Sequence, residues 1–283
     1  MSAPPLGLLL DVDGPLASTR TRTLRLPAIA RDLVALAQAG CPVVFNTGRS
    51  VDFLAERLLP ALVDAGLGPA DPVWGVGEKG GTWFSLADRG GTAAVDDIAE
   101  DPAMSPPPAV VDAVRALVDR DFSDLVFFDE TKRTMISVEH FVEVPGATFL
   151  ARRDELAAAI SRILDDHGVA DETTIYPTVI SIDVEHATSG KALGARRALD
   201  LVAPRMDPPR RWFTAGDSGQ DYDMARYLDA HGFTATHLDV RPTGDVPDVS
   251  FEVIREVPHT REGDAEDDIT ARHLARLRAE VIA

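Results

Sequence analysis

Short apolar runs alternate with segments of helical periodicity over the first 88 residues. Runs at residues 7–11, 42–46 and 73–76 are typical of strands buried on both faces. Between them, residues 27–39 and 51–65 space their apolar side chains as one face of a helix. The order strand, helix, strand, helix, strand predicts a doubly wound α/β fold, in which ligands bind at the carboxyl ends of parallel strands.

The pattern changes after residue 88, where an acidic stretch is followed by Ser105 and three prolines. Proline-rich segments favour a linker or the entry to a helix, which indicates a domain junction. The segment that follows predicts a small α+β domain. Its expected elements are a helix at 109–120, strands at 125–129 and 134–141, a helix at 154–167, and strands at 173–176 and 179–184.

The α/β pattern returns with helices at 191–202 and 221–230 and strands at 211–215 and 234–239. The middle domain is therefore an insertion. We expect residues 1–88 and 188–283 to form a core and residues 89–187 to form an inserted cap. Residues 259–268 read as a polar connector and residues 269–283 as an amphipathic C-terminal helix without assigned chemistry.

Composition narrows the possible partners. With 45% apolar and 26% charged residues the chain is typical of a water-soluble globular protein, and its 46 acidic against 28 basic side chains give a formal charge of −18. Such a surface repels nucleic acid and anionic lipid. The segment before Asp11 has no basic region and is too short to span a bilayer, so we expect a cytoplasmic protein. Nothing in the sequence indicates an oligomeric state.

The rarest reactive residues need separate attention. Cys41 is the single cysteine and its position at a strand start favours a structural role over a nucleophilic one. The basic residues are nearly all arginine, and the lysines are Lys79, Lys132 and Lys191. A compact ammonium is not replaced by a planar guanidinium where a point charge faces a phosphate. All three lysines are therefore candidate site residues.

Four motifs stand at the ends of predicted core strands or at a helix start. They are Asp11-Val12-Asp13-Gly14, Asn46-Thr47-Gly48-Arg49, Ser189-Gly190-Lys191 and Gly216-Asp217-Ser218-Gly219-Gln220-Asp221. Carboxylates two positions apart on an extended segment leave it on the same side, and hard carboxylate oxygens suit magnesium. At about 5 Å and an effective dielectric of about 20, each carboxylate pair repels by roughly 3 kcal/mol. A divalent cation and the Lys191 ammonium would offset that repulsion.

In this order and setting the motifs resemble those of the haloacid dehalogenase superfamily. An insertion between the second and third motifs is similar to the C2B-capped subgroup, which includes the Cof-like proteins and sugar-phosphate phosphatases. The resemblance implies an aspartyl-phosphate formed on Asp11, with Asp13 as general acid and base. It implies phosphate binding by Thr47, Gly48 and Lys191. The implied magnesium ligands are Asp11, Asp13 through its carbonyl, Asp217 and Asp221.

Simpler interpretations of the same residues remain. Asp13 and Asp221 could cap helices or turns, Thr47 could cap the following helix, and Lys191 could be a solvated first-turn residue. Two positions depart from the family pattern. Pro15 stands where the family usually has Thr or Val, and Gln220 replaces a frequent Asn.

Another motif points to a different cofactor. Residues 75–80, Gly-Val-Gly-Glu-Lys-Gly, match a dinucleotide fingerprint, but they run into residues 81–84, which predict a strand rather than a helix. We therefore disfavour nicotinamide or flavin binding. Glu78 and Lys79 could still contact substrate. So could Lys132 in the expected cap, within a Glu130-x-Lys132 element that resembles one in trehalose-phosphate phosphatase caps, although an exposed turn is at least as good an interpretation.

The sequence thus predicts a magnesium-dependent phosphomonoesterase for a small phosphorylated metabolite such as a sugar phosphate. A phosphomutase of the same fold and a non-catalytic ligand-binding or regulatory relative are the alternatives. Intact Asp11, Asp13, Lys191, Asp217 and Asp221 argue against the non-catalytic alternative.

Overall fold

The computed structural model describes residues 4–18, 23–258 and 265–283, and the chain divides into two compact units. Unit 1 comprises Met1–Ala99 and Gly190–Ala283, and unit 2 comprises Glu100–Ser189. The sequence placed the start of the insertion at residue 89. Residues 89–99 instead belong to unit 1, because strand β5 (Ala93–Val95) pairs with β4 (Thr82–Asp88) of its sheet.

Unit 1 is built on a sheet with the strand order β13-β12-β11-β1-β2-β3-β4-β5, and the short β6 (Ala99–Glu100) pairs with β4. The six strands from β13 to β3 run parallel, and β4 is antiparallel to β3. The parallel strands are β1 (Gly7–Leu10), β2 (Val43–Asn46), β3 (Val73–Gly77), β11 (Arg211–Gly216), β12 (Thr234–Asp239) and β13 (Glu252–Arg255).

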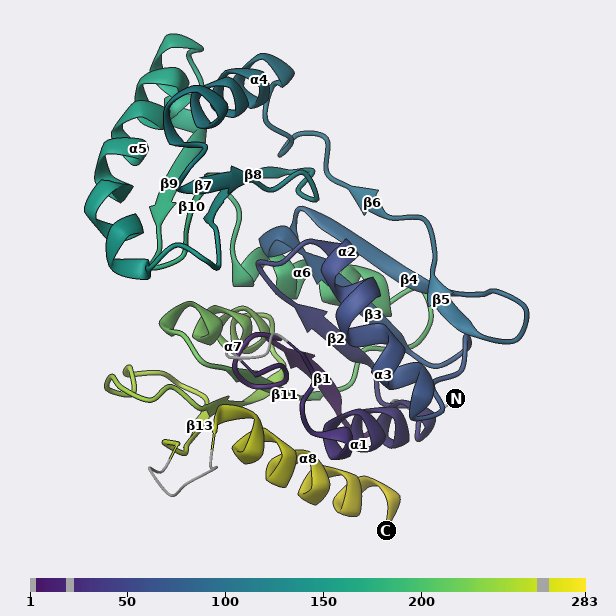
Figure 1. Ribbon diagram of the computed structural model, residues 1–283. Coiled ribbons are helices and arrows are strands. Elements are labelled where there is room, and N and C mark those ends of the chain that lie inside the picture. The colour runs from purple at the N-terminus through teal and green to yellow at the C-terminus, as the bar shows by residue number, and fades with distance from the viewer. Residues whose placement is uncertain (1–3, 19–22, 259–264) are drawn as a thin grey trace. The chain divides into compact units, whose positions relative to one another are not determined.

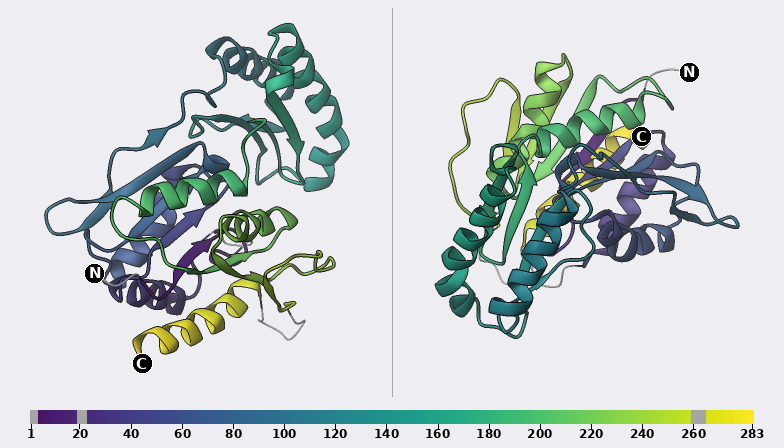
Figure 2. Two further views of the ribbon diagram at one scale, coloured as in Figure 1. Left: turned by 180° about the vertical axis from the view of Figure 1, so that it is seen from behind. Right: turned by 90° about the horizontal axis from the view of Figure 1, so that it is seen from above.

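Helices cover both faces of this sheet (Figure 1). The first face carries α1 (Pro27–Gln38), α8 (Glu266–Ile282) and a continuous helical segment made of α2 (Val51–Phe53), the π turn η1 (Leu54–Leu58) and α3 (Leu59–Asp64). The helix widens into the π turn just before Pro60, which has no amide hydrogen to donate. The opposite face carries α6 (Lys191–Val202) and α7 (Tyr222–Ala230), seen in front of the sheet in the left view of Figure 2.

The predicted doubly wound α/β fold is confirmed, and each strand expected in the core is present. One strand, β13, was missed, because the charged residues Glu252 and Arg255 leave it an apolar core of only two residues. The polar connector was predicted too long, since α8 already begins at Glu266 with three acidic residues in its first turn. Residues 259–264 of that connector lie outside the described residues.

Unit 2 is a four-stranded antiparallel sheet in the order β7-β8-β10-β9, with helices packed on one face. This agrees with the predicted α+β domain, although α5 begins at Gly146, after Pro145, earlier than expected. The elements are α4 (Pro108–Leu117), the π turn η3 (Val118–Phe122), β7 (Val126–Phe128), β8 (Met135–His140), α5 (Gly146–Asp166), the 3-10 turn η4 (Ala170–Glu172), β9 (Thr173–Pro177) and β10 (Ser181–His186). Among the described residues, no helix is long and apolar enough to cross a membrane.

Candidate active site

The carboxyl edge of the parallel strands in unit 1 gathers charged residues of the first, third and fourth motifs. Asp11 directly follows β1, Asp217 and Asp221 follow β11, and Lys191 is the first residue of α6. One carboxylate oxygen from each of the three aspartates lies within 4.8 Å of the other two. Parallel strands bring their ends to one edge, so residues more than 200 positions apart meet there.

The ammonium of Lys191 lies between Asp11 and Asp221, and the residue is almost fully buried, at 5% exposure. Its Nζ lies 2.6 Å from Oδ1 of Asp11 and 2.8 Å from Oδ1 of Asp221, and it donates to the carbonyl of Asn46 at 2.8 Å. Burial alone would lower the pKa of Lys191, but the two carboxylates raise it above its ordinary value. The lysine is therefore charged, and the interpretation of a solvated first-turn residue is wrong.

Asp11 is buried between this lysine and the other acids. Its Oδ1 also accepts a hydrogen bond from the amide of Val12 at 2.7 Å. Burial raises the pKa of Asp11 well above its ordinary value, opposed by Lys191 and reinforced by Asp221 and Asp217. The ion pair with Lys191 therefore favours the charged form of Asp11, while burial and the two neighbouring acids oppose it.

Asp217 and Asp221 have room because two glycines lie under their side chains. A Cβ on Gly14 would collide with the carboxylate of Asp217, and Gly14 has a φ of +86°, which favours glycine. A Cβ on Gly216 would collide with the carboxylate of Asp221 in the same way. Burial and the charge of Asp221 raise the pKa of Asp217 to about 7, against the lowering effect of Lys191.

Asp221 has a second task in the turn that precedes α7. Its Oδ2 accepts hydrogen bonds from the amide and the hydroxyl of Ser218, at 2.9 and 2.7 Å, and closes the capping box of the 3-10 turn η5 (Gly219–Asp221). The capping interpretation of Asp221 is therefore correct as well. Since Oδ1 faces Lys191, capping fixes the carboxylate without removing it from the cluster.

This cluster fits a magnesium ion. Three carboxylates and one ammonium leave a formal charge of −2 among these four groups, which a divalent cation would balance. Carboxylate oxygens are the donors that Mg²⁺ prefers, and Gly14 and Gly216 allow the carboxylates of Asp217 and Asp221 to take their positions in the cluster. Asp11, Asp217 and Asp221 can each offer one oxygen, although the one from Asp221 is shared with Lys191.

The side chain of Asp13 does not join the acidic cluster. Its carboxylate accepts hydrogen bonds from Nε of Arg49 at 2.9 Å and from Nη2 at 3.3 Å. Arg49 was quoted in the second motif but was given no role. Its position in the sequence could have indicated this pairing, because an arginine that follows the end of one strand can form an ion pair with a carboxylate that follows the end of the neighbouring strand. A metal contact through the Asp13 carbonyl stays a prediction.

Thr47 and Gly48 follow β2 at the same edge. Thr47 is buried, and its hydroxyl accepts a hydrogen bond from the amide of Arg49 at 3.1 Å. The helix that follows is capped by Ser50, which accepts from the amide of Phe53, so the capping interpretation of Thr47 is wrong. Phosphate binding by Thr47 and Gly48 stays a prediction.

The loop after β3 joins the second motif to the start of α6. The amide of Lys79 donates to the carbonyl of Thr47 at 3.0 Å, and the carbonyl of Lys79 accepts from Gly190 at 2.9 Å. Glu78 and Lys79 both have positive φ, 50° and 53°, a backbone conformation that costs free energy and recurs at functional sites. The Lys79 side chain passes over Gly48, with its Cε 3.6 Å from where a Cβ would stand.

No dinucleotide-type helix follows this glycine run. A single 3-10 turn, η2 (Glu78–Gly80), leads into β4, as the sequence indicated. The other candidate residue, Lys132, lies in unit 2 in the turn between β7 and β8, where Glu130 pairs with Arg115 at 2.8 Å. Cys41 is fully buried and burial raises the pKa of its thiol to about 11, consistent with a structural role.

Sequence reasoning also missed two supports of Lys191 and Asp221. The side-chain amide of Asn46 donates a hydrogen bond to the backbone carbonyl of Lys191 at 3.0 Å. The backbone carbonyl of Asn46 in turn accepts a hydrogen bond from the ammonium of Lys191. Asp239, at the end of β12, binds the hydroxyl of Tyr222, the residue after Asp221. In both cases the sequence could have indicated the residue, because each is a polar residue at the end of a buried strand, where ligands bind in this fold class.

Comparison of the sequence with models of protein families gave no match, and comparison with curated proteins gave none either. Solved structures do match. The C-terminal domain of trehalose-6-phosphate phosphatase from C. albicans is 14% identical with a TM-score of 0.65, and the Aspergillus fumigatus trehalose-6-phosphate phosphatase is 17% identical with a TM-score of 0.56. Each match covers 98% of this chain and 94% of the other.

The sucrose-phosphatase of Synechocystis, solved with sucrose and phosphate, is 14% identical with a TM-score of 0.54, over 96% of this chain and 97% of that one. All three contain an arrangement that matches this chain nearly from end to end. The fold that the four motifs predicted is thereby confirmed, and the chain has the haloacid dehalogenase fold, with an α/β core and an inserted α+β unit.

Proposed function

We propose that this chain is a magnesium-dependent phosphomonoesterase that acts on a small phosphorylated metabolite of the sugar-phosphate class. The observation that carries the proposal is the buried ammonium of Lys191 held between Asp11 and Asp221, with Asp217 beside them. This arrangement suits a dianionic phosphoryl group, since a fixed cation and a metal site flank one carboxylate nucleophile. The structural similarity to phosphatases of trehalose-6-phosphate and sucrose phosphate supports the substrate class.

In the proposed reaction an oxygen of Asp11 attacks phosphorus and the bond from phosphorus to the ester oxygen breaks. Asp13 gives its proton to that leaving oxygen, so the metabolite departs as an alcohol. Asp13 then takes a proton from water, whose oxygen attacks phosphorus and releases inorganic phosphate and the Asp11 carboxylate. Lys191 neutralises charge on Asp11 and the phosphoryl group throughout.

Other residues of the site would bind the metal, the phosphate and the rest of the substrate. Asp11, Asp217 and Asp221, with the carbonyl of Asp13, would hold Mg²⁺. The bound ion supplies positive charge that balances the acids and the phosphoryl oxygens. Thr47 and Gly48 would bind phosphate oxygens at the end of β2. We further propose that unit 2 acts as the cap and that Lys132, together with Glu78 and Lys79 of unit 1, contacts the part of the substrate beyond phosphate. Action in the cytoplasm, without nucleic acid or membrane as partner, stays a prediction.

The test is release of inorganic phosphate from a panel of phosphorylated sugars, nucleotides and organic acids, with and without Mg²⁺. The proposal expects magnesium-dependent release from at least one sugar phosphate, lost in excess chelator and in Asp11→Asn. Conversion of a sugar phosphate to its isomer without net phosphate release would favour a phosphomutase. Absence of release from every compound, with tight binding of one of them, would favour a non-catalytic binding protein.

A further inference from the structure

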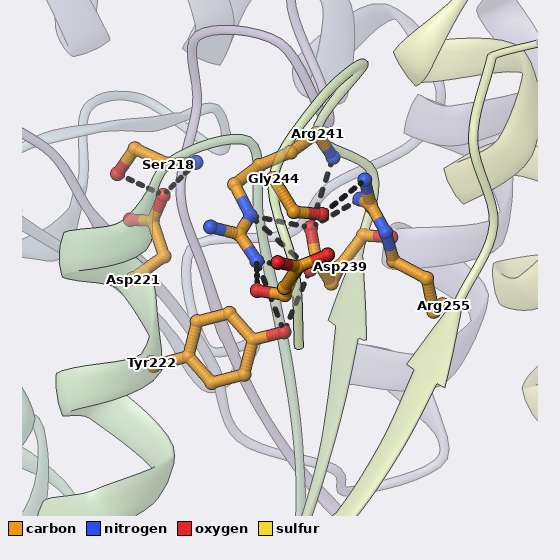
Figure 3. A network of polar contacts seen from close by, with 8 residues as sticks. Ser218, Asp221, Tyr222, Asp239, Arg241, Gly244 and Arg255 are labelled. Carbon is orange, nitrogen blue, oxygen red and sulfur yellow. Dashed lines mark hydrogen bonds and ion pairs between the residues drawn. The ribbon is translucent and has the colours of Figure 1, made fainter. Parts of the chain in front are cut away.

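A second buried carboxylate lies next to the candidate active site and is not part of it. Asp239 ends β12 and is 0% exposed. It accepts hydrogen bonds from the hydroxyl of Tyr222 at 2.6 Å, from Nη2 of Arg241 at 2.8 Å and from Nη1 of Arg255 at 2.7 Å (Figure 3). Hydrogen bonds from Arg241 and Tyr222 lower the pKa of Asp239 despite its burial. The group is a charged anchor with three side chains fixed to it.

Tyr222 connects this anchor to the turn that carries the acids. It follows Asp221 directly and is the first residue of α7, and its side chain is fully buried. The ring packs against the ring of His237, at a centroid distance of 4.3 Å, and the guanidinium of Arg241 lies over it, 5.1 Å from its centroid. The hydrogen bond to Asp239 and these two ring contacts hold the buried side chain of Tyr222 in place.

Arg241 lies beside the same turn. Its Nη1 lies 3.8 Å from where a Cβ of Gly219 would stand, and Gly219 lies between Asp217 and Asp221. The guanidinium also donates to the carbonyl of Asp245 at 3.0 Å, so the loop after β12 is fixed to the same anchor. At the start of the turn, the amide of Val240 donates to the carbonyl of Gly216, on which the Asp221 side chain rests.

We propose that Asp239 is a positioning residue which, through Tyr222 and Arg241, holds the turn of Asp217 and Asp221 in the geometry that binds Mg²⁺. The proposal rests on the proposed function, because it concerns the metal site of that reaction. Groups that orient metal ligands typically change metal affinity by about 10- to 100-fold when they are removed. Asp239 orients the ligands through Tyr222, the residue that follows Asp221, rather than by touching either carboxylate.

The experiment measures the Mg²⁺ dissociation constant by calorimetry, well below the melting temperature, for wild type, Tyr222→Phe and Tyr227→Phe. Tyr222→Phe removes only the hydroxyl on Asp239, and the constant should rise by about 10-fold. Tyr227→Phe makes the same change in the same helix, where the ring stacks on His231 away from the anchor, and the constant should stay unchanged. Circular dichroism checks that each variant is folded.

A second variant, Asp239→Asn, keeps the proposal testable if Tyr222→Phe is partly unfolded. Asp239→Asn keeps the shape and one acceptor but removes the charge, so the Mg²⁺ constant should rise further than in Tyr222→Phe. Wild-type Mg²⁺ affinity in folded Tyr222→Phe or Asp239→Asn would overturn the positioning role and leave the proposed function standing. A wild-type protein that binds no Mg²⁺ would overturn the proposed function itself, and this role with it.

Discussion

Arg49 donates hydrogen bonds to both carboxylate oxygens of Asp13, at 2.9 and 3.3 Å, and so fixes the direction of the proposed general acid. Asp13→Asn should lower turnover by about 10²- to 10⁴-fold, the usual contribution of a general acid and base. Arg49→Met should lower it by about 10- to 100-fold, because a misdirected group reacts slowly. If Arg49 acts through Asp13, the double variant should be no slower than Asp13→Asn alone.

The control for this cycle is Arg57→Met, an exposed arginine in the neighbouring π turn, which should leave turnover unchanged. Steady-state kinetics on one substrate measures all four variants. Multiplying effects of the two single variants would show that Arg49 acts on substrate directly rather than through Asp13.

Two glycines of one turn offer a matched pair. A Cβ at Gly216 would collide with the carboxylate of Asp221, whereas the atom nearest to a Cβ at Gly219 is 3.8 Å away. Gly216→Ala should therefore displace Asp221 and weaken Mg²⁺ binding and turnover at least about 10-fold. Gly219→Ala should keep both near wild type. Titration with Mg²⁺ and phosphate release decide the matter, and equal behaviour of the two variants would disprove the close packing of Asp221 on Gly216.

The acidic cluster predicts how stability depends on pH when metal is absent. The pKa of Asp217 is raised to about 7 in the folded protein from an ordinary value of 3.8. Between these values the folded state binds more protons than the unfolded state, so the free energy of unfolding falls as pH rises. In chelator, wild type should lose stability from about pH 4 to pH 7. Asp217→Asn should lose less over this range and should be more stable at pH 8, by about 1–3 kcal/mol.

Saturating Mg²⁺ should make wild type more stable than Asp217→Asn at pH 8. A ligand that binds only the folded state stabilises it, so saturating Mg²⁺ should raise the melting temperature of wild type at pH 8 and raise that of Asp217→Asn much less. Denaturant unfolding in chelator measures the first comparison, and thermal unfolding with and without Mg²⁺ measures the second. A wild-type protein that is more stable than Asp217→Asn in chelator at pH 8 would contradict the crowding of charge at this site.

The sequence predicted the core fold because buried parallel strands and the polar residues that end them leave local patterns. Asp11, Lys191, Asp217 and Asp221 each stand at such an end, and the structure brings them together. The partners that lie beside them could not be read in the same way. Asn46 meets Lys191 across 145 positions, and Asp239 meets Tyr222 because β12 ends beside α7. These contacts depend on strand order and register, which periodicity does not encode.

The errors have local causes. β13 has charged residues at both ends and was passed over, and the acidic first turn of α8 was assigned to a loop although acids favour a helix N-terminus. The pairing of the Asp13 side chain with Arg49 was not predicted. The spacing of Asp11 and Asp13 shows on which side of the strand the carboxylate lies, but not which residue binds it. That partner is Arg49, which comes from the second motif.

Lys132 tests the role of unit 2. It is one of the three lysines of the chain and lies in the turn between β7 and β8. This turn belongs to unit 2, whereas the acidic cluster belongs to unit 1. Lys132→Ala should lower kcat/KM for the physiological sugar phosphate by about 10-fold and leave hydrolysis of a small aryl phosphate unchanged, because an aryl phosphate has no sugar to contact. Equal loss on both substrates, or loss on neither, would remove Lys132 from substrate recognition.

The central claim is that Asp11 becomes phosphorylated during turnover. The direct measurement is acid quench of the enzyme after milliseconds of reaction with an activated aryl phosphate and Mg²⁺, followed by mass spectrometry of the peptide containing Asp11. Asp13→Asn is the informative variant, since the leaving group needs little protonation while hydrolysis of the intermediate still needs a base. We predict that phosphate accumulates on Asp11 in Asp13→Asn, is detectable at a lower level in wild type and is absent in Asp11→Asn. Turnover by Asp11→Asn at the wild-type rate, or phosphate-free Asp11 peptide in a slowly hydrolysing Asp13→Asn, would contradict the account.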